Sequence, residues 1–337
     1  MIDSYADAGV DTGEAGRGIA ALVAALGEAK LDRPSRSRLR SGHYASVLEI
    51  APGLGLALST DGVGSKLIIA EQAGRLDTVG IDCVAMNVND IVCVGAEPIA
   101  MLDYIAVERS DPVALRQVGV GLARGAELAG IEIPGGELAV LPDLIRGHPS
   151  PNGLELSGTA VGTVALDTMI TGELVAPGDV LIGLPASGFH SNGYTLVRRI
   201  LGERVLELAD ELLAPTVIYV KAVRALLASD IPVHGLAHIT GDGLLNLRRL
   251  NDAVGFEVLD PLPVPPICTH VCEQGRIGPT EAYQVFNMGC GFVAIVPAAD
   301  GERAAHLLAA HHTGARPIGR VTEHPGAIRV PSHDIAL

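Results

Sequence analysis

Tryptophan is absent from this 337-residue sequence, and aromatic residues make up only 3% of it, although 48% of the residues are hydrophobic. The core is therefore expected to consist of Ala, Val, Leu and Ile. Basic residues are also scarce, because 24 Lys and Arg stand against 39 Asp and Glu and leave a net charge of −15. This excess of acidic residues argues against a nucleic-acid partner, since no broad basic patch is available. A phosphorylated small molecule remains possible, bound through Mg²⁺ or backbone N–H groups.

Cysteines are few, odd in number and irregularly spaced, at positions 83, 93, 268, 272 and 290. They imply no disulfide framework, which fits a reducing cytosol. The first residues contain no basic segment followed by an apolar one, so no secretory signal is expected. No apolar run reaches the roughly 18 residues that a membrane span requires. The sequence therefore predicts a soluble, cytoplasmic protein with no membrane partner.

Two domains are expected, since 337 residues exceed one ordinary hydrophobic core. Strand-like and helix-like stretches alternate in both halves of the chain, which predicts an α/β or α+β fold. The turn-rich segment 167–179 is the expected boundary. The domains are accordingly predicted at residues 1–168 and 169–337.

Polar side chains interrupt an otherwise apolar stretch at residues 80–104. Asp82 and Asn89 are seven residues apart, and at about 100° per residue a helix returns them to nearly the same face. Asp90 lies roughly 80° further round the same helix. An Asp and an Asn on one face offer the hard oxygen ligands that Mg²⁺ prefers. The alternative is that Asp82 caps the N-terminus of the helix.

A glycine-rich turn, "STDGVGSK", leads from a predicted strand into a predicted helix at residues 59–66. It contains Asp61, Gly62, Gly64 and Lys66, and N–H groups at such a helix start attract phosphate. The spacing does not match a Walker P-loop. An ordinary turn is the alternative interpretation.

Further candidates follow predicted strands. Glu137 comes directly after a Gly pair and is typical of a metal ligand on a loop, with a surface turn as the alternative. His190 precedes a predicted helix, where it can donate to a phosphate or polarise a carbonyl. The alternative there is that Ser191 or Asn192 caps the helix. A second glycine-rich turn, 240–243, is a further candidate phosphate site.

In this order the motifs resemble those of the phosphoribosylformylglycinamidine cyclo-ligases, or AIR synthetases, in their archaeal-type branch. The resemblance extends over essentially the whole chain. The matching blocks are "SYADAGVD", "STDGVGSKL", "DTVGIDCVAMNVNDIVCVGAEPIAMLDY", "GGELAVLP", "SGFHSNGYTLVRRIL", "LLAPTVIYVKAV", "AHITGDGLLNLRRL", "FNMGCGFVAIV" and "PIGRV".

The resemblance implies a two-domain AIR-synthetase-like fold, in which the N-terminal sheets of a homodimer build a shared β-barrel. It implies an N-terminal ATP-binding and dimerisation domain and a C-terminal α/β domain. The implied reaction converts formylglycinamidine ribonucleotide and ATP into 5-aminoimidazole ribonucleotide, ADP and phosphate through an iminophosphate. Mg²⁺ is the implied partner of the triphosphate, and the implied pathway is de novo purine biosynthesis.

The resemblance also assigns roles to the candidate residues. It implies metal ligation by Asp61, Asp82 and Glu137. It implies nucleotide contacts by Asp7, Asp11, Asp61, Gly62, Gly64, Lys66, Asp82, Asn89 and Glu137, with Asp90 as an alternative support. It implies catalysis by His190, Lys66 and Asp61, and substrate binding by Ser191, Asn192, Gly241 and Gly243.

Two positions depart from the family pattern. Leu138 stands where a Thr is expected after Glu137, and Ala6 stands where many members have Lys. The loss of the hydroxyl at 138 favours one alternative, a nucleotide-binding paralogue without activity. The other alternative is a phosphoryl-transfer relative such as thiamine-monophosphate kinase, which the blocks around His190 and Gly241 argue against.

Overall fold

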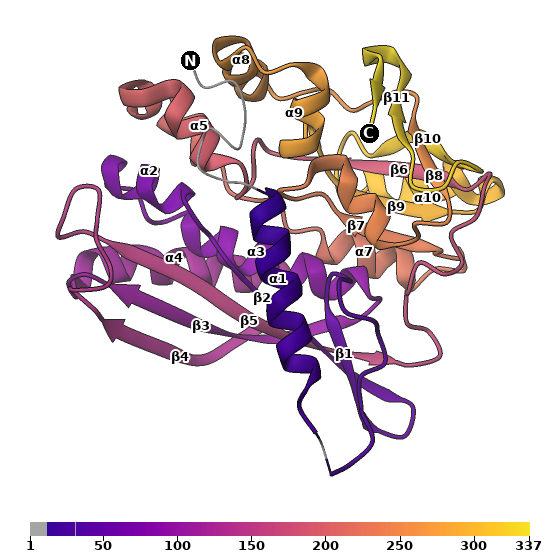
Figure 1. Cartoon of the computed structure of the whole chain (residues 1–337), viewed down its shortest axis with the longest axis horizontal. Coiled ribbons are helices and arrows are strands. Elements are labelled where there is room, and N and C mark those ends of the chain that lie inside the picture. Colours follow the sequence, from indigo (N-terminus) through magenta and orange to yellow (C-terminus); the bar gives the residue numbers. More distant parts are fainter. Residues whose placement is uncertain (1–11, 31) are drawn as a thin grey trace.

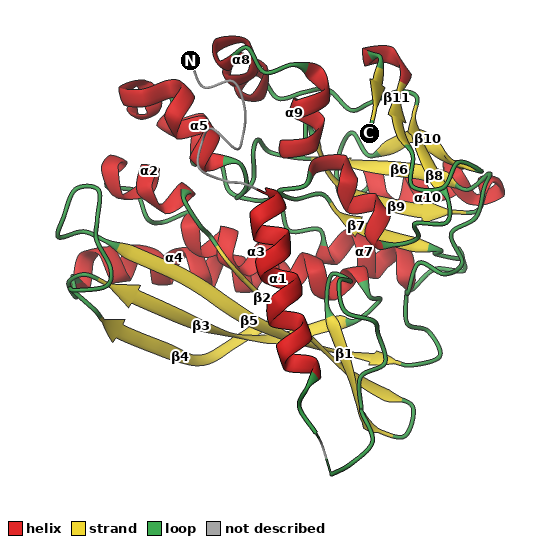
Figure 2. Ribbon diagram, viewed as in Figure 1, coloured by secondary structure: helices red, strands yellow, loops and turns green. Residues whose placement is uncertain are grey.

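The computed structural model describes residues 12–30 and 32–337. The predictions for Asp7 and Asp11 lie outside these residues. Two sheets organise the described chain, each accompanied by helices (Figures 1 and 2). This arrangement confirms the predicted mixed α/β class. In the described part of the chain, no helix is both long and apolar enough to cross a membrane.

The first sheet has five strands in the order β1-β2-β5-β3-β4. Its strands are β1 (Ser46–Ala51), β2 (Leu54–Gly62), β3 (Glu97–Val107), β4 (Glu132–Val140) and β5 (Leu154–Ala165). The accompanying helices are α1 (Thr12–Gly27), α2 (Lys66–Ala73), α3 (Val79–Cys93) and α4 (Pro112–Ala129). All neighbouring strands are antiparallel except β3 and β4, which α4 connects as a parallel pair.

The second sheet has seven strands in the order β12-β11-β8-β10-β6-β9-β7. Its strands are β6 (Val180–Pro185), β7 (Gly235–His238), β8 (Gly255–Val258), β9 (Cys290–Val296), β10 (Arg316–Thr322), β11 (Ile328–Val330) and β12 (Ile335–Ala336). The α-helices of this half are α5 (Tyr194–Leu201), α6 (Ala209–Leu212), α7 (Val220–Leu227), α8 (Pro266–Gly275), α9 (Pro279–Val285) and α10 (Gly301–Ala309). Four 3-10 helices complete it: η1 (Gly202–Leu206), η2 (Gly243–Arg249), η3 (Ala298–Asp300) and η4 (Pro331–His333).

The Asp-Pro pair at residues 111–112 predicts the start of a helix, and α4 begins there. The side chain of Asp111 accepts hydrogen bonds from the backbone N–H groups of Val113 and Ala114, and Pro112 occupies the first turn. Glycines let α4 lie directly against α3, because a Cβ on Gly80 would come within 2.1 Å of Leu122 N. This close contact fixes α3 over one face of the first sheet.

Helix α3 is the central element of the molecule. Apart from Ile81 and Asp90 its residues are buried. It packs on β2 and β5 of the first sheet and also contacts α7 and β7 of the second half. The polar residues of α3 therefore lie where the two halves of the chain meet (Figure 1).

The opposite face of the first sheet is open in the described chain. Leu102 and Tyr104 on β3 keep 54% and 42% of their surface exposed. Ile99, on the same strand, is also exposed. Alternation along the strand sends Leu102 and Tyr104 away from α3, so this face carries apolar groups that the described chain does not cover.

Candidate active site

Asp82 and Asn89 share one face of α3, as their spacing predicts, and both bind the backbone of segment 214–219. Asp82 Oδ1 accepts hydrogen bonds from Thr216 N and Thr216 Oγ1, both at 2.7 Å. Asn89 Oδ1 accepts from Tyr219 N, and Asn89 Nδ2 donates to Val217 O, both at 2.9 Å. The segment has no regular secondary structure. Side chains of α3 thus supply the partners that its buried backbone requires.

The predicted alternative for Asp82, an N-terminal cap, is wrong, because α3 begins at Val79 after Thr78. Asp82 instead forms a fully buried ion pair with Lys66, with 2.9 Å between Nζ and Oδ2. Burial lowers the pKa of Lys66, and the charge and hydrogen bond of Asp82 oppose that shift.

Lys66 also joins α2 to two loops of the second half. Its ammonium group donates to the carbonyl of His190 at 3.0 Å and to that of Ala214 at 2.8 Å. With Asp82 as the third acceptor, these bonds use all three ammonium hydrogens. No hydrogen is left over for a phosphate, and the pair holds two loops in place.

Asp61 and Asp103 lie in one row across the first sheet, with Gly158 between them. Asp61 on β2 pairs with Gly158 on β5, and Gly158 pairs with Asp103 on β3. A Cβ on Gly158 would come within 3.2 Å of the sulfur of Cys83 on α3, so this row faces α3. Burial raises the pKa of both carboxyl groups.

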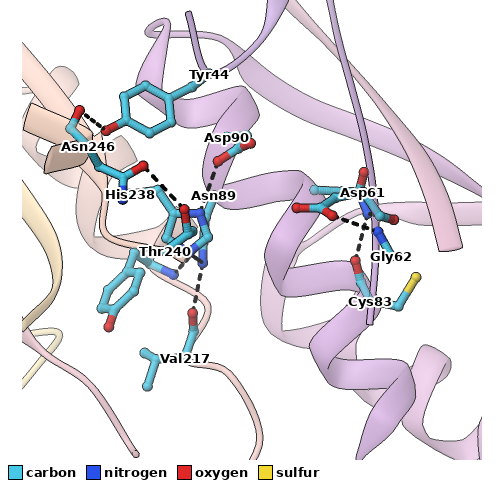
Figure 3. A network of polar contacts seen from close by, with 12 residues as sticks. Tyr44, Asp61, Gly62, Cys83, Asn89, Asp90, Val217, His238, Thr240 and Asn246 are labelled. Carbon is cyan, nitrogen blue, oxygen red and sulfur yellow. Dashed lines mark hydrogen bonds and ion pairs between the residues drawn. The ribbon is translucent and has the colours of Figure 1, made fainter. Parts of the chain in front are cut away.

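Asp90 on α3 is a further carboxylate that acts on Asp61. Its charge is a further cause of the raised pKa of Asp61. Asp90 Oδ1 lies 2.9 Å from Nδ1 of His238, which is fully buried at the end of β7 (Figure 3). Asp61 Oδ1 accepts from Gly62 N at 2.7 Å.

Asn89 determines which nitrogen of His238 carries the proton. Because Asn89 Oδ1 accepts from Tyr219 N, its amide nitrogen faces His238 Nε2 at 3.3 Å and must donate to it. The proton of the neutral ring is therefore on Nδ1, which donates to Asp90. His238 thus orients the carboxylate of Asp90 (Figure 3).

Glu137 lies apart from these carboxylates. It belongs to strand β4 rather than to a turn, so the surface-turn alternative is wrong. Its neighbour Gly136 pairs with Asp103, and a Cβ there would lie 2.4 Å from that carboxyl carbon. Glu137, one residue further, points to the opposite face of the sheet.

The three predicted metal ligands, Asp61, Asp82 and Glu137, are consequently not brought together. Across residues 12–30 and 32–337, no group of three His, Cys, Asp or Glu side chains is arranged to hold a metal ion. Burial raises the pKa of Asp61, and the charge of Asp90 adds to that effect, so these two carboxylates influence each other.

His190 is buried in the loop before α5, in a left-handed backbone conformation with φ of 62°. Its Nε2 accepts the backbone N–H of Ser187 at 3.3 Å. Burial holds its pKa well below the usual range, and the charge of Lys66 acts in the same direction. His190 is therefore neutral, with its proton on Nδ1, which has no partner among the described residues.

The neighbours of His190 complete this loop. Ser191 Oγ lies 2.9 Å from Thr216 Oγ1. Helix α5 has Gly193 as its N-terminal cap and no side-chain cap, so the capping alternative for Ser191 and Asn192 is wrong. Asn192 Oδ1 is buried without a partner in the described part of the chain.

The glycine-rich turn of residues 240–243 meets this loop. A Cβ on Gly241 would lie 3.2 Å from Asn192 Nδ2. Gly243 has a positive φ of 51°, and a Cβ there would lie 2.1 Å from the carbonyl oxygen of Tyr283. Position 243 thus requires glycine, whereas a Cβ at position 241 would press only on the side chain of Asn192.

Two contributors were not predicted as site residues. His238 ends the short buried strand "GLAH". A polar side chain in an otherwise apolar strand is a sign of a functional residue that the sequence offered. Thr216 gave no signal, because its importance depends on contacts with Asp82 and Ser191, which are distant in the sequence.

Comparisons with known proteins identify the same family in both halves of the chain. Residues 42–164 match the family described as AIR synthase related protein, N-terminal domain, and residues 176–330 match its C-terminal domain. A phosphoribosylformylglycinamidine cyclo-ligase of Methanothermobacter thermautotrophicus is 48% identical over 84% of each chain. The enzyme of that name from Thermococcus kodakarensis is 44% identical over 99% of each chain.

Solved structures share the fold at lower identity. Thiamine monophosphate kinase from Aquifex aeolicus is 17% identical, with a TM-score of 0.61 over 95% of this chain and 97% of that one. The hydrogenase maturation protein HypE in complex with ATP is 20% identical, with a TM-score of 0.62 over 89% of this chain and 87% of that one. These two likenesses concern the fold alone.

Proposed function

The chain belongs to the phosphoribosylformylglycinamidine cyclo-ligase family, whose members are ligases, and we propose that it makes 5-aminoimidazole ribonucleotide from formylglycinamidine ribonucleotide and ATP. ADP and phosphate are the other products. The observation that carries this proposal is the similarity to cyclo-ligases through both halves of the chain. The reaction belongs to de novo purine biosynthesis, which agrees with a cytoplasmic enzyme.

The chemistry has two steps. ATP phosphorylates the formyl oxygen, because an amide-like oxygen is a poor leaving group until it carries a phosphate. An amidine nitrogen of the resulting iminophosphate then attacks the same carbon, the ring closes, and phosphate leaves. Ring closure is intramolecular, so a site that holds the two groups together supplies much of the acceleration.

We assign the nucleotide side of the site to Asp61 and Asp90. The donor chemistry fits Mg²⁺, since these are hard oxygen ligands. Burial raises the pKa of Asp61, and repulsion from the charge of Asp90 adds to it. A bound cation would relieve that repulsion. Mg²⁺ would neutralise the triphosphate and the charge that develops during phosphoryl transfer. His238 would hold Asp90 in place through its Nδ1–H.

The other predicted nucleotide contacts form part of the same proposal. The backbone N–H of Gly64 would contact phosphate. Gly62 would orient Asp61 through the hydrogen bond that its N–H already donates. Asp82, Asn89 and Lys66 would act by positioning segment 214–219 and the loop at His190, given the bonds they already make. Asp7 and Asp11 remain predicted to fold over the nucleotide. Glu137 would take part in metal binding only from the opposite face of the first sheet.

We assign the substrate side to the loop 187–192 and the turn 240–243. Neutral His190 presents an N–H at Nδ1, which is suited to the formyl oxygen, because a neutral donor polarises a carbonyl without transferring its proton at once. Asn192, Gly241 and Gly243 would form the surrounding contacts.

The two parts of the chain would have different roles. Residues 1–168 would bind ATP and form the homodimer, and residues 169–337 would complete the substrate site. The uncovered apolar groups Leu102 and Tyr104 support dimerisation through the first sheet. Burial of this face against a second copy would give it the cover that one chain lacks.

Turnover tests the proposal. Purified protein would be mixed with formylglycinamidine ribonucleotide, ATP and Mg²⁺, and ADP and the imidazole product would be measured together. Equal amounts of both are expected. ADP without the imidazole would indicate another phosphoryl acceptor, with thiamine monophosphate tested next, and binding of ATP without either product would indicate a non-catalytic paralogue.

A further inference from the structure

Three buried side chains form a hydrogen-bonded chain from the substrate loop to α3. Ser191 Oγ lies 2.9 Å from Thr216 Oγ1, and Thr216 Oγ1 lies 2.7 Å from Asp82 Oδ1. Asp82 is paired with Lys66. None of the four residues exposes more than 7% of its surface, so water does not compete for these bonds.

The ion pair determines the direction of the hydroxyl protons. Asp82 Oδ1 accepts hydrogen bonds from the ammonium of Lys66 and from Thr216 N, so it faces Thr216 Oγ1 as an acceptor. Thr216 therefore donates its single hydroxyl proton to Asp82. Its oxygen can then only accept from Ser191, so the hydroxyl proton of Ser191 points at Thr216.

Ser191 consequently offers a ligand only the lone pairs of its oxygen. It can accept an N–H or O–H, whereas a phosphate or carbonyl oxygen placed there would meet another acceptor. The preceding residue has the opposite character, because His190 carries its proton on Nδ1 and that atom is buried without a partner among the described residues. The loop thus carries an unpartnered donor and an acceptor on consecutive residues.

We infer that Thr216 is a positioning residue that fixes Ser191 as a hydrogen-bond acceptor for an amidine N–H of the substrate. The inference rests on the proposed function. The formyl oxygen requires a donor and the amidine requires an acceptor, which is the pair that His190 and Ser191 present. The arrangement would favour an amidine over the corresponding amide, whose carbonyl oxygen cannot donate.

Binding of two matched ligands tests the inference. The amidine substrate and its amide analogue, formylglycinamide ribonucleotide, would be titrated calorimetrically into the wild type, Thr216→Val and Thr216→Ser. Thr216→Val is nearly isosteric and keeps the backbone N–H bonded to Asp82, but it frees the hydroxyl of Ser191 to rotate. Thr216→Ser keeps the hydroxyl and serves as the control.

The wild type is expected to prefer the amidine strongly. Thr216→Val should reduce the ratio of the two affinities by about tenfold or more, the equivalent of one misdirected hydrogen bond. Thr216→Ser should retain the wild-type ratio. KM for ATP should remain unchanged in both variants, because the chain of hydroxyl groups leads to the substrate loop.

Other outcomes overturn the inference. Equal weakening of both ligands in Thr216→Val would indicate a purely structural role, and an unchanged ratio would show that Ser191 is not oriented by Thr216. If Thr216→Val does not fold, Ser191→Ala provides the same test, because removal of the acceptor should also lower the ratio. Failure of the wild type to form the imidazole product would count against the proposed function, whereas turnover with an unchanged ratio would count against this inference alone.

Discussion

Lys66 and Asp82 form an ion pair at the meeting point of the two halves, with both side chains fully buried and 2.9 Å between their charged atoms. Around the pair lie the carbonyls of His190 and Ala214 and the hydroxyl of Thr216. The pair therefore connects α2 and α3 to the loops proposed to bind the substrate. Its removal should affect stability and substrate binding together.

Lys66→Met should lower the free energy of unfolding by about 3–5 kcal/mol, because it leaves a buried carboxylate without its cation. Urea denaturation measures this change. Arg124→Ala is the control, since Arg124 and Glu127 form an exposed pair on α4 whose loss should change little. A loss below about 1 kcal/mol for Lys66→Met would contradict a structural role for the pair.

Stability should fall in mild acid because of buried histidines. Burial lowers the pKa of His43 to about 4, while an unfolded histidine titrates near 6.5. Below about pH 6.5 the unfolded chain therefore binds more protons than the native one, and stability decreases as the pH falls.

His43→Asn isolates this contribution. The free energy of unfolding of both proteins should decrease between pH 7.5 and 5.5. The decrease should be about 1 kcal/mol smaller for the His43→Asn variant than for the wild type. Denaturant titrations at the two pH values provide the comparison. Parallel declines for the two proteins would show that His43 is not kept neutral by the fold.

His238→Ala should raise the Mg²⁺ concentration required for half-maximal activity by about 10–100-fold, because Asp90 loses the donor that orients it. KM for the formylglycinamidine substrate should change much less. His306→Ala, an exposed substitution on α10, is the control. An unchanged Mg²⁺ requirement would place the cation away from Asp90.

Leu102→Glu should convert the proposed homodimer to a monomer, because it introduces a charge into the uncovered face of the first sheet. Sedimentation velocity distinguishes the two states. Leu174→Glu, at another exposed leucine, should leave the assembly intact. A dimer that persists in Leu102→Glu would exclude this face as its interface.

Local patterns in the sequence predicted several parts of the structure. The period of the helix placed Asp82 and Asn89 on one face, and the Asp-Pro pair before α4 marked its start. The fold class was predicted correctly from alternating strand-like and helix-like stretches, and the family from motifs present in both halves of the chain. These features depend on neighbours that are close in the sequence.

Local sequence patterns could not predict which residues these side chains contact. Asp82 was predicted to bind a metal, and its hydrogen bond with Thr216 was not predicted. The two residues are 134 positions apart, and no local spacing in the sequence connects them. Likewise, the face on which Glu137 lies depends on the register between β3 and β4. Long-range pairing therefore decides which polar residues share a site.

Transfer of oxygen is the most direct test of the cyclo-ligase mechanism. The substrate would be prepared with ¹⁸O in its formyl group and incubated with ATP, Mg²⁺ and the enzyme, and the released phosphate would be analysed by mass spectrometry. Because ATP phosphorylates the formyl oxygen, that oxygen should leave in the phosphate, with one label for each imidazole formed. Unlabelled phosphate would contradict the account, since the ring would then close without phosphorylation of the formyl oxygen.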